Sequence, residues 1–328
     1  MKRTLTLAVM VFVIVQLQAK IIYVKAGNDG NGKSWKSALG HLQDALAAAE
    51  PNDEIWVAKG VYYPTTDDNR NVSFVIPDEV AVYGGFNGSE KELDERDWMK
   101  NLTVLSGAIG KEDLSDNSFT VVYIKNASSE TILDGFIITQ GYANGYSMKG
   151  ELDRCGGGLF NDGSEGESSP IIKNCLFQEN YARDGGAIFN YSKSGASAPK
   201  VENCQFIANI ADLDGGAIYN DGSNGICSPT ITKCYFSKNE ATYGASIMNT
   251  ASYGSVRSKI SHSYFYKNIS YIRGSSIYNT RDKGVLKPIM TNCTMTDNVD
   301  PVGRSNCTNP NNNSIEDSNE LYFREISY

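Results

Sequence analysis

The chain has 328 residues and a formal net charge of −8 at neutral pH, with only two His. If a leader containing Lys2 and Arg3 is removed, the 30 Lys and Arg fall to 28 against 38 Asp and Glu, a net charge of about −10. An acidic surface excludes general binding to nucleic acid and acidic lipid, because neither releases counterions to it. A strongly polyanionic sugar is also a poor partner unless a local basic cluster or bound cations intervene.

Residues 1–19 are expected to form a secretory signal peptide. Lys2 and Arg3 precede a mostly apolar run that ends at Val15, and the small residue Ala19 lies before Lys20. The apolar run is too short to cross a bilayer, which takes about 20 residues. We therefore expect an exported protein without a transmembrane span, in which residues 20–328 form one domain.

The first part of the mature chain combines short strands with one helix. Apolar runs predict strands at 21–24, 54–58, 80–86, 102–107 and 120–124. Residues 37–49 carry Leu42, Ala45 and Leu46 on one side and are followed by Pro51, which predicts an amphipathic helix that stops there. The charged segment 87–100, which contains Trp98, is expected to leave the regular column.

A repeat of about 30 residues fills 131–300. Its members share a Gly-rich phrase that ends in Asn, and the five copies are 156–161, 185–190, 215–220, 244–249 and 274–279. A second phrase keeps the same step, with a small residue at Cys175, Cys204, Cys234, Ser263 and Cys293, and each copy closes on an Asn at 180, 209, 239, 268 and 298. A fixed period of this length indicates a stacked repeat architecture.

Each repeat is β in character, because its apolar residues alternate and no helical pattern survives across a unit. An apolar residue three positions before each cysteine, such as Ile172 before Cys175, cannot share a face of one continuous strand with it. The chain should therefore bend near Asn174, giving about three short strands per unit. These features predict an all-β parallel β-helix in which like side chains stack, with the helix at 37–49 capping its N-terminal end.

The phrases Phe-x-x-Asn and Gly-Gly-Ala-Ile resemble the repeat of polymorphic outer membrane proteins and the wider pectin-lyase-like β-helix group. The match is carried by 177–180, 206–209, 236–239, 265–268, 185–188 and 215–218. The resemblance implies a right-handed helix and a secreted or cell-surface protein of a Gram-negative bacterium. In the enzymes of that group, acidic residues on neighbouring turns act as catalysts or calcium ligands. No lyase or hydrolase motif matches this chain residue by residue.

Four of the seven cysteines share the inward repeat position, where a free thiol behaves as a small hydrophobe. Parallel stacking points their Cβ bonds the same way, so free thiols are favoured over disulfides. A linear column does not give zinc its tetrahedral ligands. Cys155, Cys227 and Cys307 lie off the column, and their state stays open.

The candidate catalytic residues are Asp184, Asp214 and Arg183, just before two copies of the Gly-rich phrase. Asp184 and Asp214 should lie on adjacent turns, and paired carboxylates about 5 to 9 Å apart are what glycoside hydrolases use. The alternative, which we favour, is that both Asp accept backbone N–H bonds at a corner.

Candidate substrate-binding residues are aromatic side chains expected to face outward. One column runs beside the inward Ile of the Gly-rich phrase, and a separate pair lies after the cysteines: Phe160, Phe189, Tyr219, Tyr278, Tyr235 and Tyr264. Such a column could stack on sugar rings, or the loops that follow it could fold over it. Loop cover is the favoured alternative.

Two functions are compatible with this sequence. The first, which we favour, is a non-catalytic module that binds a polysaccharide or a surface protein. The second is a polysaccharide lyase or glycoside hydrolase acting at the stacked carboxylates, so enzyme activity stays open. No cofactor or metal is expected, calcium is not indicated, and a monomer is expected.

Overall fold

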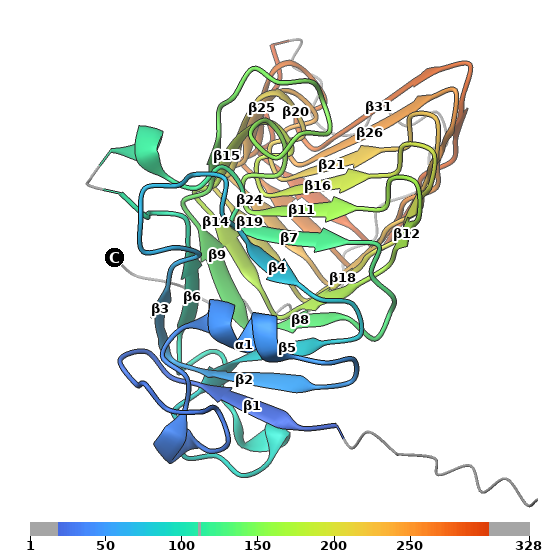
Figure 1. Cartoon of the computed structure of the whole chain (residues 1–328). Helices are drawn as coiled ribbons and strands as arrows, with labels where there is room; N and C mark the ends of the chain where they lie inside the picture. Colours follow the sequence, from blue (N-terminus) through green and yellow to red (C-terminus); the bar gives the residue numbers. More distant parts are fainter. Residues whose placement is uncertain (1–18, 111–112, 302–328) are drawn as a thin grey trace, which may run out of the picture.

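The computed structural model describes residues 19–110 and 113–301, in which the chain winds into a right-handed parallel β-helix (Figure 1). All strand pairs of the named ladders are parallel, and sheet A, with nine strands, shows that there are nine turns in this part of the chain. The predicted signal peptide lies almost wholly outside the described residues. The fold class predicted from the repeat is confirmed.

Three longer sheets form the main walls of the β-helix. Sheet A contains β1 (Ile21–Val24), β2 (Glu54–Ala58), β5 (Ala81–Phe86), β8 (Ile132–Asp134), β13 (Ile171–Lys173), β18 (Lys200–Glu202), β23 (Thr230–Thr232), β28 (Lys259–Ser261) and β33 (Ile289–Thr291). Sheet B contains β3 (Gly60–Tyr62), β6 (Thr103–Ser106), β9 (Phe136–Thr139), β14 (Leu176–Gln178), β19 (Gln205–Ile207), β24 (Tyr235–Ser237), β29 (Tyr264–Tyr266) and β34 (Thr294–Thr296). Sheet C contains β4 (Phe74–Ile76), β7 (Val122–Lys125), β11 (Leu159–Asp162), β16 (Ile188–Tyr191), β21 (Ile218–Asp221), β26 (Ile247–Ser252) and β31 (Ile277–Asp282).

Two shorter sheets connect these walls, so a regular turn has five strands rather than the three predicted. Sheet D, between B and C, contains β10 (Tyr142–Ala143), β15 (Tyr181–Asp184), β20 (Ile210–Asp214), β25 (Glu240–Tyr243) and β30 (Ile269–Arg273). Sheet E, between C and A, contains β12 (Glu167–Ser168), β17 (Ala196–Ser197), β22 (Ile226–Cys227), β27 (Ser255–Val256) and β32 (Val285–Leu286). The extra strands were missed because two to five residues are too few to show a period.

The corner between sheets A and B is the bend predicted near Asn174. Asn174 has a φ of 53°, and the residues at this position on other turns also have positive φ: Asn203, Lys233, His262 and Asn292. A second positive-φ corner follows sheet B at Glu179 and its equivalents. The Asn column therefore lies one residue beyond that corner, and its role is to hydrogen-bond neighbouring turns rather than to adopt the left-handed conformation itself.

Columns of identical side chains fill the interior, as the repeat predicted. In sheet B the rings of Phe177, Phe206, Phe236 and Phe265 are stacked with centroids 4.7–5.2 Å apart. In sheet A, Ile172, Val201, Ile231 and Ile260 are paired in register and are 0–2% exposed. Burying one such aliphatic or aromatic side chain contributes about 1.5–3 kcal/mol, so each turn adds a contribution of this size in each column.

Two ladders of buried Asn run along the same axis. In the first, Asn180 Nδ2 donates to Asn209 Oδ1 at 3.0 Å and to the Ile138 carbonyl oxygen at 2.9 Å, and the pattern continues through Asn239, Asn268 and Asn298. In the second, Asn190 Nδ2 donates to Asn220 Oδ1 at 2.8 Å within a ladder from Asn161 to Asn279. Each buried amide is thus satisfied by the next turn.

The predicted helix is present but shorter than residues 37–49. A 3-10 turn covers Trp35–Ser37, and α1 covers only Leu42–Ala48. Leu42, Ala45 and Leu46 are buried, and α1 contacts β1, β2 and β4, the first strand of sheet C (Figure 1). The residues before α1 are not helical because Leu39 pairs with Val24 of β1 in a parallel bridge, and its N–H donates to the Tyr23 carbonyl oxygen at 2.9 Å. Two further 3-10 turns cover Leu93–Glu95 and Leu114–Asp116.

Candidate functional site

The outer face of sheet C carries the predicted aromatic column, and the column is buried. Phe160, Phe189 and Tyr219 lie in register on β11, β16 and β21, are 0–1% exposed, and touch edge to face at 5.1–5.2 Å. Only Tyr278, on β31, is half-buried. The interpretation of the column as an exposed surface for sugar rings is therefore wrong for the first three positions, because a loop covers them.

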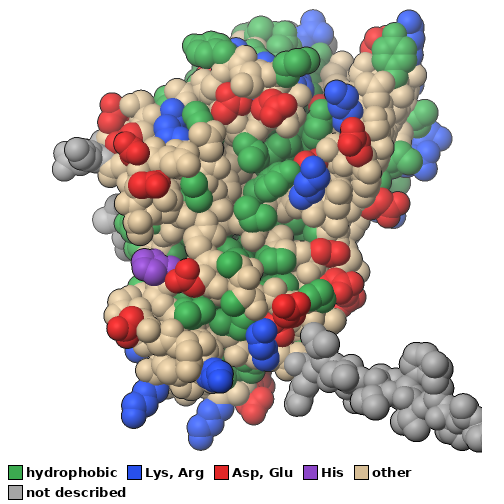
Figure 2. All heavy atoms as spheres, viewed as in Figure 1, with side chains coloured by type: hydrophobic (Ala, Val, Ile, Leu, Met, Phe, Trp, Pro, Cys, Tyr) green, Lys and Arg blue, Asp and Glu red, His purple; other side chains and the backbone are tan. Residues whose placement is uncertain are grey.

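The covering loop is the segment between β10 and β11, residues 144–155, which we call the strap. Arg70 Nη2 donates to Asn144 Oδ1 at its start, and Cys155 at its end pairs with Asp184 in a parallel bridge. Leu152 and Cys155 pack against the aromatic column. Figure 2 shows this side of the molecule, with hydrophobic side chains in its centre and charged side chains around them.

The strap carries Lys149, whose ammonium lies between the two candidate carboxylates. Asp184 and Asp214 occupy paired positions on β15 and β20, as predicted for adjacent turns. Lys149 Nζ is 3.4 Å from Asp184 Oδ1 and 3.4 Å from Asp214 Oδ2. Nζ also donates to the Tyr219 hydroxyl at 2.8 Å and lies 4.5 Å from the centre of its ring.

The sequence predicted Arg183 near the carboxylates, but the arginine that contacts Asp184 is Arg154. Arg154 Nε donates to Asp184 Oδ2 at 2.7 Å. Arg183 instead lies over the ring of Tyr146, 4.7 Å from its centre, on the outer surface of the strap. The structure therefore groups Asp184 and Asp214 with Lys149 and Arg154, and places Arg183 in a different contact.

Burial and charge set the protonation of this cluster. Burial raises the pKa of the Asp214 carboxyl, and the charge of Asp184 adds to the shift, although Lys149 opposes it. Burial would lower the pKa of Lys149, but Tyr219, Asp184 and Asp214 together raise it. The Asp184 side chain is fully buried and that of Asp214 is 18% exposed. The ammonium between them occupies the space that a substrate would need.

A groove lies beside the strap on the same face. It has a volume of about 340 Å³ and is formed by strands β7, β11 and β16, the strap and two loops after sheet C: Tyr123, Lys125, Gly150, Glu151, Leu152, Phe160, Asp162, Ser164, Glu165, Tyr191 and Lys193. The Tyr123 hydroxyl donates to Asp162 Oδ2 at 2.8 Å, and Lys125 Nζ lies 3.7 Å from the same oxygen. Burial raises the pKa of Tyr191 to about 12, so its hydroxyl keeps its proton and can donate.

Sequence reasoning missed this groove because a non-repeating segment forms one wall. The sequence did contain one indication of the groove. Two residues after each aromatic residue of the column comes a polar side chain or a tyrosine, and these residues pair on adjacent turns: Asp162, Tyr191 and Asp221. Residues two apart on a strand share a face, so these side chains were bound to lie beside the aromatic rings.

The second predicted aromatic pair, Tyr235 and Tyr264, lies on the outer face of sheet B. Their rings are nearly parallel, with centroids 5.7 Å apart, and both residues are half-buried. The two rings face each other along the column, and a role of this pair in binding sugar stays a prediction.

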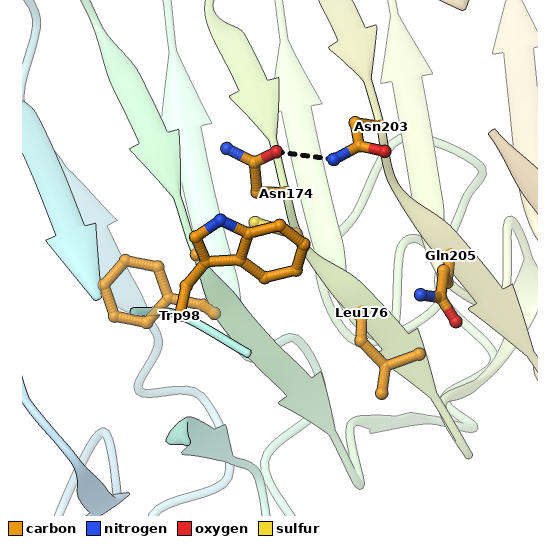
Figure 3. Close-up of a pocket in the computed structure, with 8 residues that line it drawn as sticks. Trp98, Asn174, Leu176, Asn203 and Gln205 are labelled. Carbon is orange, nitrogen blue, oxygen red and sulfur yellow. Dashed lines mark hydrogen bonds between the residues drawn. The ribbon is translucent and has the colours of Figure 1, made fainter. Parts of the chain in front are cut away.

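The nearest depression along sheet B, beside Trp98, has a volume of only about 10 Å³ and is lined by Asn174, Leu176, Asn203 and Gln205 (Figure 3). That volume holds about one water, so the depression does not extend the tyrosine surface into a ligand pocket.

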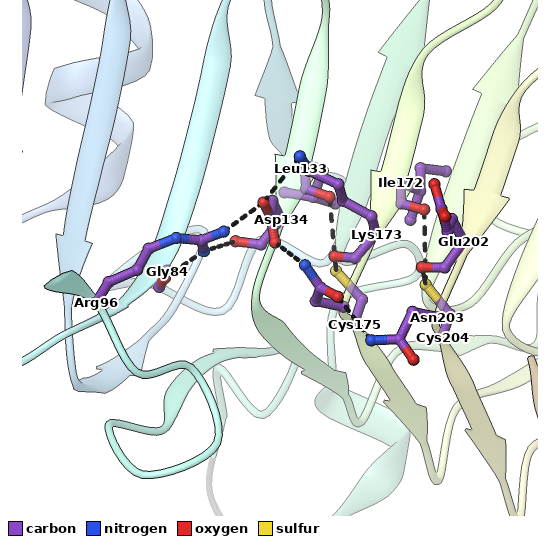
Figure 4. A network of polar contacts seen from close by, with 11 residues as sticks. Gly84, Arg96, Leu133, Asp134, Ile172, Lys173, Cys175, Glu202, Asn203 and Cys204 are labelled. Carbon is purple, nitrogen blue, oxygen red and sulfur yellow. Dashed lines mark hydrogen bonds and ion pairs between the residues drawn. The ribbon is translucent and has the colours of Figure 1, made fainter. Parts of the chain in front are cut away.

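The neighbouring polar network is structural (Figure 4). Arg96 pairs with the fully buried Asp134 and donates to the Gly84 carbonyl oxygen, which holds the segment 87–101 against the turn corner. Asn174 Nδ2 donates to the other Asp134 oxygen at 2.8 Å, and Asn203 continues the chain of amides. The segment predicted to leave the column is thus fixed to it.

The cysteine column is aligned as predicted. Cys175, Cys204, Cys234 and Cys293 are buried and free, and each thiol donates to the carbonyl oxygen two residues earlier at 3.2–3.3 Å. Cys155 and Cys227 are also free and buried, while Cys307 lies outside the described residues. In residues 19–110 and 113–301, no group of three or more His, Cys, Asp or Glu is placed to hold a metal ion.

Comparisons with known proteins give one family match and several distant structural similarities. The profile of the Chlamydia polymorphic membrane protein repeat matches residues 174–191. Solved structures that the chain resembles include a pectin methylesterase from Aspergillus niger, at 12% identity over 92% of each chain with a TM-score of 0.45. The pectate lyase Pel9A aligns at 13% identity over 91% of this chain and 83% of its own, with a TM-score of 0.46. A rhamnogalacturonan lyase aligns at 9% identity over 84% and 87%, with a TM-score of 0.36.

No curated protein matches the chain. The activities of the three aligned enzymes have no bearing on this chain at such low identity. What the coordinates define is a right-handed parallel β-helix, in which one stretch, residues 174–191, matches the polymorphic membrane protein repeat. Across the described part of the chain, no helix has both the length and the apolar character that crossing a membrane requires.

Proposed function

We propose that this protein is an exported, non-catalytic module that binds a glycan in the groove beside the strap. The observation that carries the proposal is the contrast between two neighbouring sites. The groove is open and lined by tyrosines and by exposed polar side chains, such as Glu165 and Lys193. The carboxylates that an enzyme would need are instead enclosed with Lys149 and Arg154.

The groove chemistry suits a sugar. Its volume is at the lower end of the range for ligand sites, about 300–1,000 Å³, which accommodates one or two sugar rings. Tyr123, Asp162, Ser164 and Lys125 offer donors and acceptors to hydroxyl groups, while the Tyr191 ring adds an apolar surface. Both charge signs line the groove, so it does not select a polyanion. Export rests on the features of residues 1–19 and accords with the polymorphic membrane protein repeat.

Titration calorimetry against a panel of neutral oligosaccharides tests the proposal. Lys193→Ala and Tyr123→Phe should each weaken binding of a recognised sugar about tenfold, equivalent to about 1.4 kcal/mol. Lys200→Ala is the matched control, because Lys200 is an exposed lysine on sheet A outside the groove. Binding that is unchanged in the groove variants would contradict this site. If the wild type released reducing or unsaturated ends from a glycan and Asp184→Asn did not, the protein would be an enzyme and not a binding module.

A further inference from the structure

Lys149 is held as a ligand is held in a binding site. Its ammonium contacts two carboxylates on neighbouring turns, one hydroxyl and one aromatic face, all provided by the β-helix and none by the strap. A primary ammonium has three donors, and two of them are used in hydrogen bonds to Asp214 Oδ2 and the Tyr219 hydroxyl. Asp184 Oδ1 pairs with the charge at 3.4 Å without a hydrogen bond. The ring of Tyr219 adds a cation–π contact.

Both ends of the strap are bonded to the β-helix, at Asn144 and at Arg154 and Cys155, but its middle, which carries Lys149, makes few other hydrogen bonds to it. Within residues 145–153, the backbone–backbone hydrogen bonds stay inside the strap, for example from Gly145 N to the Asp153 carbonyl oxygen at 2.7 Å. One further bond to the body is made by the Thr120 hydroxyl, which donates to the Leu152 carbonyl oxygen. Tyr146 and Met148, on either side of the strap tip, are 89% and 80% exposed. Apart from Lys149, the middle of the strap is held by the bond from Thr120, by the packing of Leu152 and by the contact between Tyr146 and Arg183, so Lys149 makes its only ion pairs to the body.

The strap is also a wall of the proposed glycan groove. Gly150, Glu151 and Leu152 line the groove directly after Lys149 in the chain. Raising the strap would join the groove to the space beneath it, where Phe189 and Tyr219 lie next to the carboxylate pair. The joined site would offer aromatic side chains to a sugar ring and two carboxylates to a cation.

We propose that Asp184, Asp214 and Tyr219 form a recognition site for a primary ammonium, that Lys149 occupies it as an internal ligand, and that an amino sugar with a free amine takes its place when the strap opens. The inference deepens the proposed function and rests on it for the choice of a glycan. Acetylation of the amine removes both the charge and two of the three donors, so the acetylated form of the same sugar lacks what the site recognises.

The ammonium site is tested with Lys149→Ala and propylammonium chloride, which supplies the three methylenes and the ammonium that the substitution removes. The variant should have a lower Tm than the wild type, because two largely buried carboxylates lose their partner. Propylammonium should restore at least half of that loss in a saturable way, whereas tetramethylammonium chloride at the same ionic strength should not. Equal effects of the two salts would overturn the proposal. If the variant does not fold in buffer, recovery on refolding in the two salts decides in the same way.

The glycan step is tested with glucosamine hexamers that are fully deacetylated or fully acetylated. Lys149→Ala should bind the deacetylated hexamer at least about tenfold more tightly than the wild type does, because the internal ligand no longer competes. The double variant Lys149→Ala, Asp214→Asn should lose that gain. Equal affinity of Lys149→Ala for the two hexamers rejects the amine site. The groove proposal is judged separately, by neutral oligosaccharides and the Lys193→Ala variant.

Discussion

At the scale of single residues, buried polar groups fix the register of the turns. Asn209 accepts from the backbone N–H of Asn180 at 3.2 Å and from its Nδ2 at 3.0 Å, while its own Nδ2 donates to the Phe177 carbonyl oxygen at 2.9 Å. A one-residue slip of any turn would break these bonds and also move the inward side chains to the outside. The ladders thus specify one arrangement among many that are equally hydrophobic.

Asn209→Leu should destabilise the protein by about 3 kcal/mol or more, because two buried donors of Asn180 lose their acceptor. Urea unfolding followed by circular dichroism measures the change. Asn71→Leu, at an exposed position, should stay within about 0.5 kcal/mol of the wild type. A small effect at position 209 would mean that the ladder can be replaced by an apolar column of similar size.

Asp214 gives a prediction for the pH dependence of stability. Its raised pKa means that the folded state holds the proton more firmly than the unfolded state does. The stabilisation this provides is present below the usual Asp range and is lost as pH rises through the raised pKa. The Asn side chain of the Asp214→Asn variant does not titrate. The Tm of the variant minus the Tm of the wild type should therefore increase between pH 4 and pH 7.

Asp67 provides a control of opposite sign for this measurement. The hydroxyl of Thr65 lowers the pKa of the Asp67 carboxyl, and the backbone N–H of Asn69 adds to the shift. Its contribution is present above the usual Asp range and is lost as pH falls. Asp67→Asn should therefore lose Tm relative to the wild type as pH rises. The same trend in both variants would show that local charge at Asp214 is not the cause.

At the scale of elements, the segments that break the repeat decide what the surface can bind. The segment 87–101 lies directly on β5, where a Cβ on Gly85 would come within 2.5 Å of the Trp98 Cα. Gly85 also has a φ of 97°, which side chains rarely adopt. Gly85 is thus required both by its conformation and by the backbone packed on it.

Gly85→Ala should destabilise the fold by about 2–4 kcal/mol, since either the strand or the Trp98 segment has to move. Gly27→Ala is the matched control, because Gly27 has a φ of 82° and a Cβ there would meet nothing within 4 Å. The control isolates the cost of the backbone conformation, about 1–2 kcal/mol. Thermal unfolding of both variants measures the difference, and equal costs would argue against close packing at Gly85.

The sequence predicted those elements that repeat and failed where they do not. The stacking of the cysteines and the alignment of Ile172, Val201 and Ile231 followed from periodicity, because residues one period apart lie on neighbouring turns. The helix was predicted too long because the backbone of Leu39 hydrogen-bonds to β1, a long-range contact that the periodicity does not show. The burial of Phe160 and Phe189 could not be predicted because it depends on the strap, whose own sequence has no period. Lys149 could not be placed from spacing because its partners are 35 and 65 residues away in sequence.

At the scale of the whole molecule, the described cysteines are buried in three separate hydrophobic clusters: four in the interior of the β-helix, Cys155 beneath the strap and Cys227 beside Val256. All six are free and buried, and burial raises the pKa of Cys293 to about 11 and of Cys234 to about 12. A thiol must be both exposed and ionised to react quickly, so these thiols should be inert in the folded state.

Labelling of the native protein with iodoacetamide, followed by peptide mass mapping, should leave all six of these cysteines unmodified. Labelling in guanidinium chloride should modify each of them. A reducing agent should not change the Tm, because none of the six is in a disulfide. Rapid native labelling of Cys175 or Cys204 would show that the column opens to solvent.

The way the sheets are built also determines how the chain can acquire its structure. Each strand of sheet A beyond the first pairs with a strand of the turn before it, and in the regular part that partner is only 29 or 30 residues away in sequence. Stability in such an array is close to a sum of nearest-neighbour terms. If the N-terminal end of the chain is released first, α1 can pack on β1, β2 and β4 before the rest follows. Each later turn can then pair with the folded turn before it, without waiting for the C-terminal part of the chain.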